Sequence, residues 1–215
     1  MSPEARKEIR EYLLRGDYGE IAKLASSNKG VLGHLISLTY DKADIICWRA
    51  IEAVGRLSGG MRMSQAKDAL ERVLTMMRDE SGGNPWSGPE LLGEIILNNA
   101  DRFEHYISIL ASFHEEEIFT AGILRALSRL AGPAYKEVLP YRELAFIYLH
   151  HKDPSIKGNA LLVLKALKDD TYAASIRELL PDKAEFVFYN GGHLVKKTIG
   201  ETAEETLRAV NSQKF

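Results

Sequence analysis

Three histidines stand near the ends of predicted helices, where imidazole and carboxylate groups together could bind a metal ion. His114 precedes Glu115, and His150 precedes His151 about one predicted repeat later. Histidine nitrogen and carboxylate oxygen are common ligands of zinc and iron. An imidazole is also favoured at the negative end of a helix without any metal. The sequence favours this second interpretation and leaves a binding role for the three histidines open.

No nucleophile in the sequence is accompanied by an identifiable general base. The single cysteine, Cys47, lies between Ile46 and Trp48, an apolar setting that predicts an inert, buried thiol. The segment ESGGNPWSGPE (80–90) is rich in glycine and proline but lacks the Lys-Ser/Thr of a phosphate-binding loop. It is either a plain connector ordered by its prolines or a binding loop. We therefore expect no enzyme, no catalytic residue, no metal and no cofactor.

Arginine, glutamate and tryptophan side chains recur on predicted helices in a pattern that could bind a partner protein. Arg and Trp are enriched among the residues that dominate interface energies, and mixed charges set selectivity. Two alternatives stay open: the charged residues could form a solvated, mutually paired face, and the tryptophans could pack between repeats with the indole N–H bonded to backbone. The predicted partner-binding residues are Arg49, Glu52, Arg56, Trp86, Glu90, Glu94, Arg125 and Arg129.

Composition argues against nucleic-acid and membrane partners. The chain has 215 residues with 28 Lys and Arg against 30 Asp and Glu, so its net charge is −2. Such a balance creates no field that would gather nucleic acid or anionic lipid. No apolar run approaches the roughly 18 residues that span a bilayer, and the charged segment 1–20 has no apolar signal core. We expect a cytosolic protein with a hydrophobic core.

The helices that would position these side chains are marked by caps and apolar periodicity. Ser2 and Pro3 predict a helix start, and this first helix runs to about Arg15. Asp17 is expected to cap a second helix that reaches about Ser26. These elements, within residues 1–28, would form an N-terminal helical cap. A third helix is predicted over 29–40.

A repeat explains the similarity of WRAIEAVGRL (48–57) and WSGPELLGEI (86–95). Four aliphatic residues, Val54, Leu92, Leu127 and Leu164, are separated by 38, 35 and 37 residues. Each lies on a predicted helix that follows another helix and an acidic turn. A pair of antiparallel helices cannot bury its own apolar faces, so such units must stack. Close approach between neighbouring helices favours Ala or Gly at the crossing.

The segments DKADIICWRAIEAVGRL (41–57) and DPSIKGNALLVLKAL (153–167) resemble HEAT repeats, specifically the short bacterial kind grouped with the phycobilisome-lyase-type repeats. The match includes Asp153, Pro154, Lys157, Ala160 and Leu164, although Lys165 replaces the family's glycine. The resemblance implies an all-α, right-handed α-α superhelix, a HEAT-like solenoid of about four helix pairs over residues 29–180. We predict one such domain over 1–215.

The tail, residues 184–215, has a different pattern. The pattern predicts a β-hairpin formed by EFVFY (185–189) and HLVKKTI (193–199). Asn190 and Gly191 are expected to supply the positive φ angles of its turn. Thr202 and Glu205 predict the capping box of a last helix that ends near Val210. Phe186 and Phe188 share one strand face. The tail is therefore expected to cap the last repeat.

The function that follows is a non-catalytic scaffold that binds another protein on the concave face of the solenoid. The alternative, implied by the resemblance, is a bilin or tetrapyrrole lyase-like or chaperone-like subunit. The sequence names neither the partner nor the pathway, and it leaves the oligomeric state open.

Overall fold

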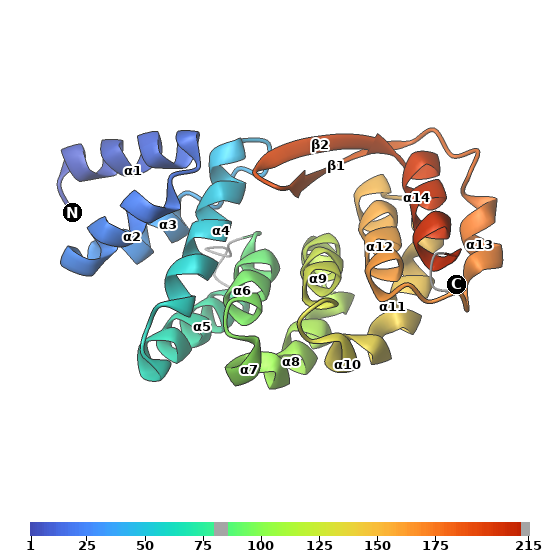
Figure 1. The fold of residues 1–215 in the computed structure, drawn as a ribbon, viewed down its shortest axis with the longest axis horizontal. Coiled ribbons are helices and arrows are strands. Elements are labelled where there is room, and N and C mark those ends of the chain that lie inside the picture. Colours follow the sequence, from blue (N-terminus) through green and yellow to red (C-terminus); the bar gives the residue numbers. More distant parts are fainter. Residues whose placement is uncertain (80–85, 212–215) are drawn as a thin grey trace. The chain divides into compact units, whose positions relative to one another are not determined.

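The structure, a computed structural model, describes residues 1–79 and 86–211 and divides the chain into two compact units. The first comprises residues 1–99 together with 191–193, and the second comprises residues 100–190 and 194–215. Helices build nearly all of both units (Figure 1). The single domain predicted over 1–215 remains a prediction.

The first unit contains six helices among the described residues. Within it α4 packs against α1, α2, α3, α5 and α6, so α4 is its central element. The helices are α1 (Pro3–Arg15), α2 (Tyr18–Ser27), α3 (Gly30–Ser37), α4 (Ile45–Gly59), α5 (Met63–Met77) and α6 (Gly88–Leu97).

Among its described residues, the second unit combines short helical segments with three longer helices, α9, α12 and α14, and α12 packs against both of the others. Its first part holds α7 (Ala100–Phe103), η1 (Glu104–Tyr106), α8 (Ile107–Ser112), η2 (Phe113–Glu115), α9 (Glu117–Leu130), α10 (Tyr135–Val138) and η3 (Leu139–Tyr141). The rest holds α11 (Arg142–Ile147), η4 (Tyr148–His150), α12 (Pro154–Leu167), α13 (Ala173–Glu178), β1 (Glu185–Asn190), β2 (His193–Thr198) and α14 (Ile199–Asn211).

Two predicted N-caps are confirmed. The Ser2 hydroxyl accepts a hydrogen bond from the Ala5 N–H at 3.2 Å, and the Asp17 carboxylate accepts one from the Glu20 N–H at 3.2 Å. Each satisfies a backbone donor that has no partner within the helix. The helix predicted over 29–40 is shorter, because α3 ends at Ser37.

The predicted repeat is confirmed by burial. Val54, Leu92, Leu127 and Leu164 lie on α4, α6, α9 and α12, and each is 0% exposed. Packing is close at Gly55, where an added Cβ would lie 2.7 Å from the Glu94 carbonyl oxygen on α6. A glycine at this crossing lets the two helices approach closely.

These features confirm the predicted class, an all-α fold of HEAT-like helix pairs. Figure 1 shows the helix α9, the helix α12 and the last helix, α14, side by side in the second unit.

The predicted hairpin of β1 and β2 is also present. One aspect of its turn was predicted wrongly: the positive φ angles belong to Gly191 (57°) and Gly192 (87°), and Asn190 ends β1. Glycine adopts both angles without steric cost, which suits a two-residue hairpin turn.

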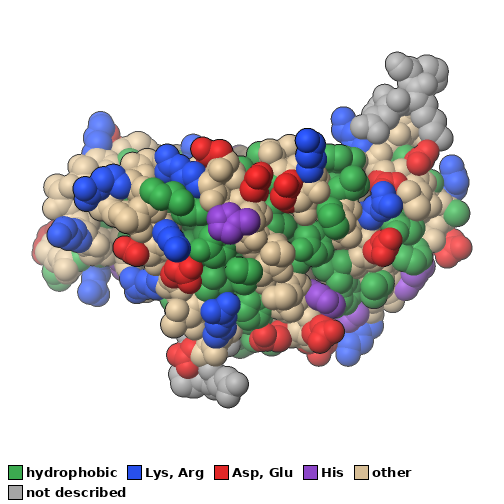
Figure 2. Space-filling view, turned by 90° about the horizontal axis from the view of Figure 1, so that it is seen from below, with side chains coloured by type: hydrophobic (Ala, Val, Ile, Leu, Met, Phe, Trp, Pro, Cys, Tyr) green, Lys and Arg blue, Asp and Glu red, His purple; other side chains and the backbone are tan. Residues whose placement is uncertain are grey.

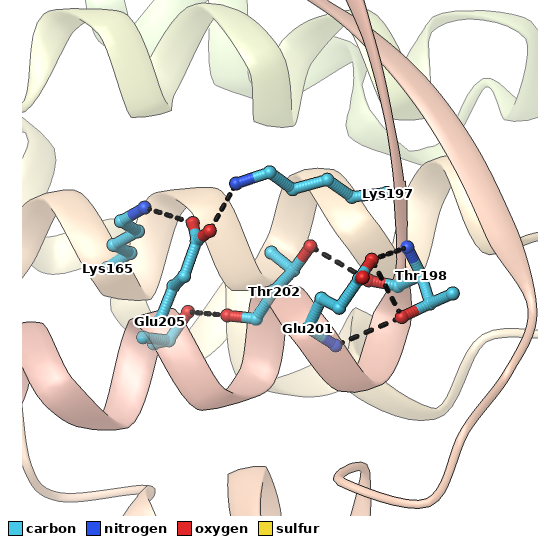
Figure 3. A network of polar contacts seen from close by, with 7 residues as sticks. Lys165, Lys197, Thr198, Glu201, Thr202 and Glu205 are labelled. Carbon is cyan, nitrogen blue, oxygen red and sulfur yellow. Dashed lines mark hydrogen bonds and ion pairs between the residues drawn. The ribbon is translucent and has the colours of Figure 1, made fainter.

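The capping box of the last helix lies one turn earlier than predicted. The Thr198 hydroxyl accepts a hydrogen bond from the Glu201 N–H at 3.1 Å, and the Glu201 carboxylate accepts one from the Thr198 N–H at 2.8 Å (Figure 3). Thr202 is inside the helix and donates to the Thr198 carbonyl. Glu205 instead pairs with Lys165 and Lys197. Thr-x-x-Glu occurs twice in succession, and the first copy is the cap.

The aromatic face of the hairpin packs on α12. Phe186 and Phe188 are stacked with ring centres 5.2 Å apart, and both are buried. Gly158 makes room for the Phe186 ring, because an added Cβ would lie 2.5 Å from it. The prediction that these two residues share one covered face is confirmed.

Candidate functional site

Arg49 forms a structural contact within the first unit. Its guanidinium donates to the carbonyl oxygens of Leu13 at 2.9 Å, Leu14 at 2.5 Å and Gly192 at 3.0 Å. Leu13 and Leu14 lie in the last turn of α1, where the negative end of the helix dipole attracts cations. Its predicted role in binding a partner therefore stays a prediction, and Arg49 also has a role in the fold.

Glu52 and Arg56, one turn apart on α4, form a cluster with Tyr18 of α2. The Tyr18 hydroxyl donates to Glu52 at 2.9 Å, and the Arg56 guanidinium donates to the same carboxylate at 2.7 Å. The guanidinium also lies 4.6 Å from the centre of the Tyr18 ring. The Glu52 side chain is 15% exposed and that of Arg56 55% exposed, so the cluster holds an accessible arginine in place.

The predicted residues of α6 and of the turn before it lie in different environments. Trp86 lies in that turn and is 64% exposed. Trp48, its counterpart in the repeat, is half-buried and donates from its indole N–H to the Lys42 carbonyl at 2.8 Å. The backbone-bonded interpretation therefore holds for Trp48, whereas Trp86 presents its ring to solvent. The segment 80–90, for which the sequence left a connector and a binding loop open, falls partly outside the described residues, because these omit 80–85.

Glu90 is buried in the first unit and Glu94 is half-buried. One oxygen of the Glu90 carboxylate accepts from the Lys42 ammonium at 2.6 Å. The other oxygen is buried and has no hydrogen-bond partner in the described part of the chain. A residue with 5% exposure offers little surface to a partner.

Arg125 and Arg129 lie on α9 in the second unit. Arg125 is buried and donates to the carbonyl oxygen of Tyr189 on β1, with its guanidinium 5.9 Å from the centre of the Phe188 ring. Arg129 is half-buried. Six of the eight predicted partner-binding residues belong to the first unit, and Arg125 and Arg129 belong to the second. Among the eight, Arg56 and Trp86 are the most exposed.

A groove opens beside Arg56 in the first unit. Two overlapping cavities of about 320 and 400 Å³ share Ala25, Lys29, Leu57, Met61 and Gln65 as lining residues. Arg56 lines the larger one, and Leu32, Asp68 and Arg72 line the other. We call this surface the α2–α5 groove. Concave surfaces with an apolar lining and a few polar groups are typical binding sites.

Two of the three histidines considered above, His114 and His151, lie beside Tyr148 in the second unit. The Tyr148 hydroxyl donates to the His114 carbonyl at 3.0 Å, and the rings of Tyr148 and His151 are centred 6.0 Å apart. Burial raises the pKa of Tyr148. Over residues 1–79 and 86–211, no group of three or more His, Cys, Asp or Glu side chains is arranged to hold a metal ion.

Cys47 is buried, as predicted, with its sulfur 3.8 Å from the Ser87 hydroxyl. Burial raises the pKa of the thiol to about 12, so the reactive thiolate is scarce near neutral pH. None of the helices in the described ranges combines the length and apolar character that crossing a bilayer requires.

Comparisons with known proteins bear on the fold. No protein-family model and no curated protein matches the chain. Two engineered proteins solved by the Northeast Structural Genomics Consortium are similar in structure. One is 17% identical with a TM-score of 0.54, covering 97% of this chain and 91% of that chain; the other is 14% identical with a TM-score of 0.50, covering 97% and 90%. A designed armadillo repeat protein is 15% identical with a TM-score of 0.48, covering 98% and 96%.

Likeness at this level of identity shows a shared fold and carries no function. The tetrapyrrole alternative therefore gains no support from these similarities. Sequence reasoning missed Tyr18, Lys29 and Arg72, which lie beside the predicted residues only in three dimensions. Only Tyr18 could have been placed from the sequence, because it directly follows the cap residue Asp17 and must therefore begin α2.

Proposed function

We propose that the protein is a non-catalytic scaffold that binds another protein, with the cytosol as its compartment. The proposal is supported chiefly by the Tyr18–Glu52–Arg56 cluster at the edge of the α2–α5 groove. Tyrosine and arginine are enriched among the residues that dominate interface energies, and a side chain already held in place loses less entropy on binding. The exposed Trp86 is a second candidate anchor.

The finer parts of the proposal derive from the sequence. They are the concave face of the solenoid as the docking surface and the kinship with bacterial phycobilisome-lyase-type HEAT repeats. In the first unit, Arg56, Glu52 and Trp86 are the candidates for contact. We expect Arg49 and Arg125 to contribute less to partner binding, because their guanidinium groups already donate to backbone carbonyls.

The test is quantitative affinity capture from native lysate with the immobilised protein, followed by mass spectrometry. Arg56→Glu is the diagnostic variant, and Arg208→Glu is its matched control. Both arginines pair with a glutamate four residues earlier on an exposed helix surface. Proteins captured by the wild type and by Arg208→Glu, but lost with Arg56→Glu, support the proposal. Failure of all three to enrich any protein over an unrelated column of equal size contradicts it.

A further inference from the structure

The α2–α5 groove combines an apolar floor with a basic rim. Ala25, Leu32, Leu57 and Met61 are half-buried, so their apolar surface remains within reach of a ligand. Burying such surface is the main source of favourable free energy in association. The apolar floor by itself does not identify the ligand of the groove, but the charged residues around it indicate which ligands are favoured.

Two of the three cations on the rim have no ion-pair partner among the described residues. Lys29 and Arg72 are exposed, and no carboxylate of the described chain lies within salt-bridge distance of either. Asp68, one turn before Arg72 on α5, is the only acidic side chain among the described residues that line the groove. Arg56, the third cation, already pairs with Glu52. The rim therefore carries positive charge on a chain whose net charge is −2.

Figure 2 shows Lys and Arg side chains spread over the end of the first unit that carries α1, α2 and α3. Arg72 lies against α3 itself, because an added Cβ at Gly33 would be 3.7 Å from its guanidinium. A cation held near a helix surface, with solvent on its other side, is placed to meet a carboxylate from a partner.

We propose that the α2–α5 groove receives an acidic amphipathic helix of a partner protein, with apolar side chains on the groove floor and carboxylates against Lys29 and Arg72. This inference rests on the proposed function and names the partner chemistry. A groove bounded by helices suits the docking mode in which a helix inserts residues i, i+3 or i+4 and i+7. Together, Lys29 and Arg72 favour carboxylates and disfavour a basic segment.

The test uses a displayed library of random peptides about 12 residues long, enough for about three helical turns. The peptides are selected on the full-length protein, and the enriched pool is measured for binding to each variant. We expect enriched sequences with Leu, Ile, Phe or Met at helical spacing, flanked by Asp or Glu. The double variant Lys29→Glu/Arg72→Glu should bind the pool about tenfold more weakly or worse, because attraction becomes repulsion.

Lys67→Glu is the matched control. It reverses an exposed lysine on α5 that does not line the groove, so binding of the pool should persist. Selection of the library on Lys29→Glu/Arg72→Glu should enrich Lys-rich and Arg-rich peptides instead. Binding of basic peptides by the charge-reversed variant would show that it is folded and that only its charge preference has changed. Circular dichroism checks the helix content of each variant.

Equal binding of the pool to the wild type and the charge-reversed variant would overturn the inference, as would enrichment of basic peptides by the wild type. Sodium oleate is the competitor that represents a small amphiphile. If it displaced a peptide probe and its own binding depended on Lys29 and Arg72, the groove would be a lipid site. The peptide tests could fail while whole proteins are still captured in a way that depends on Arg56. That result would support the scaffold function and contradict only the assignment of the groove to an acidic helix.

Discussion

Arg125 donates a hydrogen bond to the main-chain oxygen of Tyr189, which lies 64 residues later in the chain. The side chain is 9% exposed, so the guanidinium is largely removed from water. Its charge lies beside a backbone carbonyl and an aromatic ring, Phe188. This contact attaches β1 to α9 within the second unit, on a helix face that the sequence predicts to bind a partner.

We expect Arg125→Ala to lower the free energy of unfolding by about 2 kcal/mol, because the buried Tyr189 carbonyl loses a charged donor. Urea denaturation followed by circular dichroism measures the change. Lys136→Ala, an exposed substitution in the same unit, should stay within about 0.5 kcal/mol of wild type. If the two variants were equally stable, Arg125 would be available for a partner and its contact to β1 would contribute little.

Gly55→Ala should destabilise the first unit by about 1–3 kcal/mol, because the new methyl group would collide with the α6 backbone at Glu94. Gly60→Ala is the control at the end of the same helix, where an added Cβ meets its nearest atom at 3.6 Å, an ordinary contact. Thermal melts of both proteins distinguish them. Similar melting temperatures would mean that α4 and α6 separate easily and that the small residue is not required.

Thr198→Ala should cost about 1 kcal/mol, because it removes the hydroxyl that caps α14. Thr198→Ser keeps the hydroxyl and should cost much less. A double-mutant cycle with Glu201→Ala is expected to show coupling, since the two residues bond reciprocally. Additive losses would argue against a capping box at this position.

The stability of the second unit should fall in acid. The hydrogen bond from Lys157 lowers the pKa of Asp182 below its ordinary value of 3.8. Burial raises the pKa of Glu205, but the hydrogen bonds and charges of Lys165 and Lys197 outweigh it and hold this pKa below 4.5. A lowered pKa in the folded state means that the unfolded chain takes up protons more readily. This contribution to stability is therefore present above the ordinary values and is lost as pH falls through the folded ones.

Urea midpoints measured between about pH 6 and pH 3 should show this loss. Glu205→Gln should lower stability at neutral pH and flatten part of the acid-induced fall (the ion pairs it removes are those of Figure 3). Glu116→Gln, an exposed change outside the network, should leave the profile unaltered. A profile for Glu205→Gln identical to wild type would show that the Lys165 and Lys197 pairs are too weak to matter.

Sequence periodicity was sufficient for the helix pairs and their buried faces. Val54, Leu92, Leu127 and Leu164 could be placed in the core because stacking requires an apolar residue once per repeat. The cap residues Ser2 and Asp17 were also predictable, since a cap is a local contact between residues three apart. Where the local signal occurred twice, at Thr198 and Thr202, periodicity could not choose the copy that begins α14.

Helical phase shows which face of a helix a charged side chain occupies, and the tertiary structure decides what that side chain contacts. Arg49 and Arg56 lie on the same outer face of α4, yet one donates to carbonyls at the end of α1 and the other lies over Tyr18. Chain segments far apart in sequence supply those acceptors, and no pattern within α4 encodes them. The same reason explains why Lys29 and Arg72 meet at one groove only in the folded protein. The sequence by itself determined the repeat and its core, and only tertiary packing decided which charges are left for a partner.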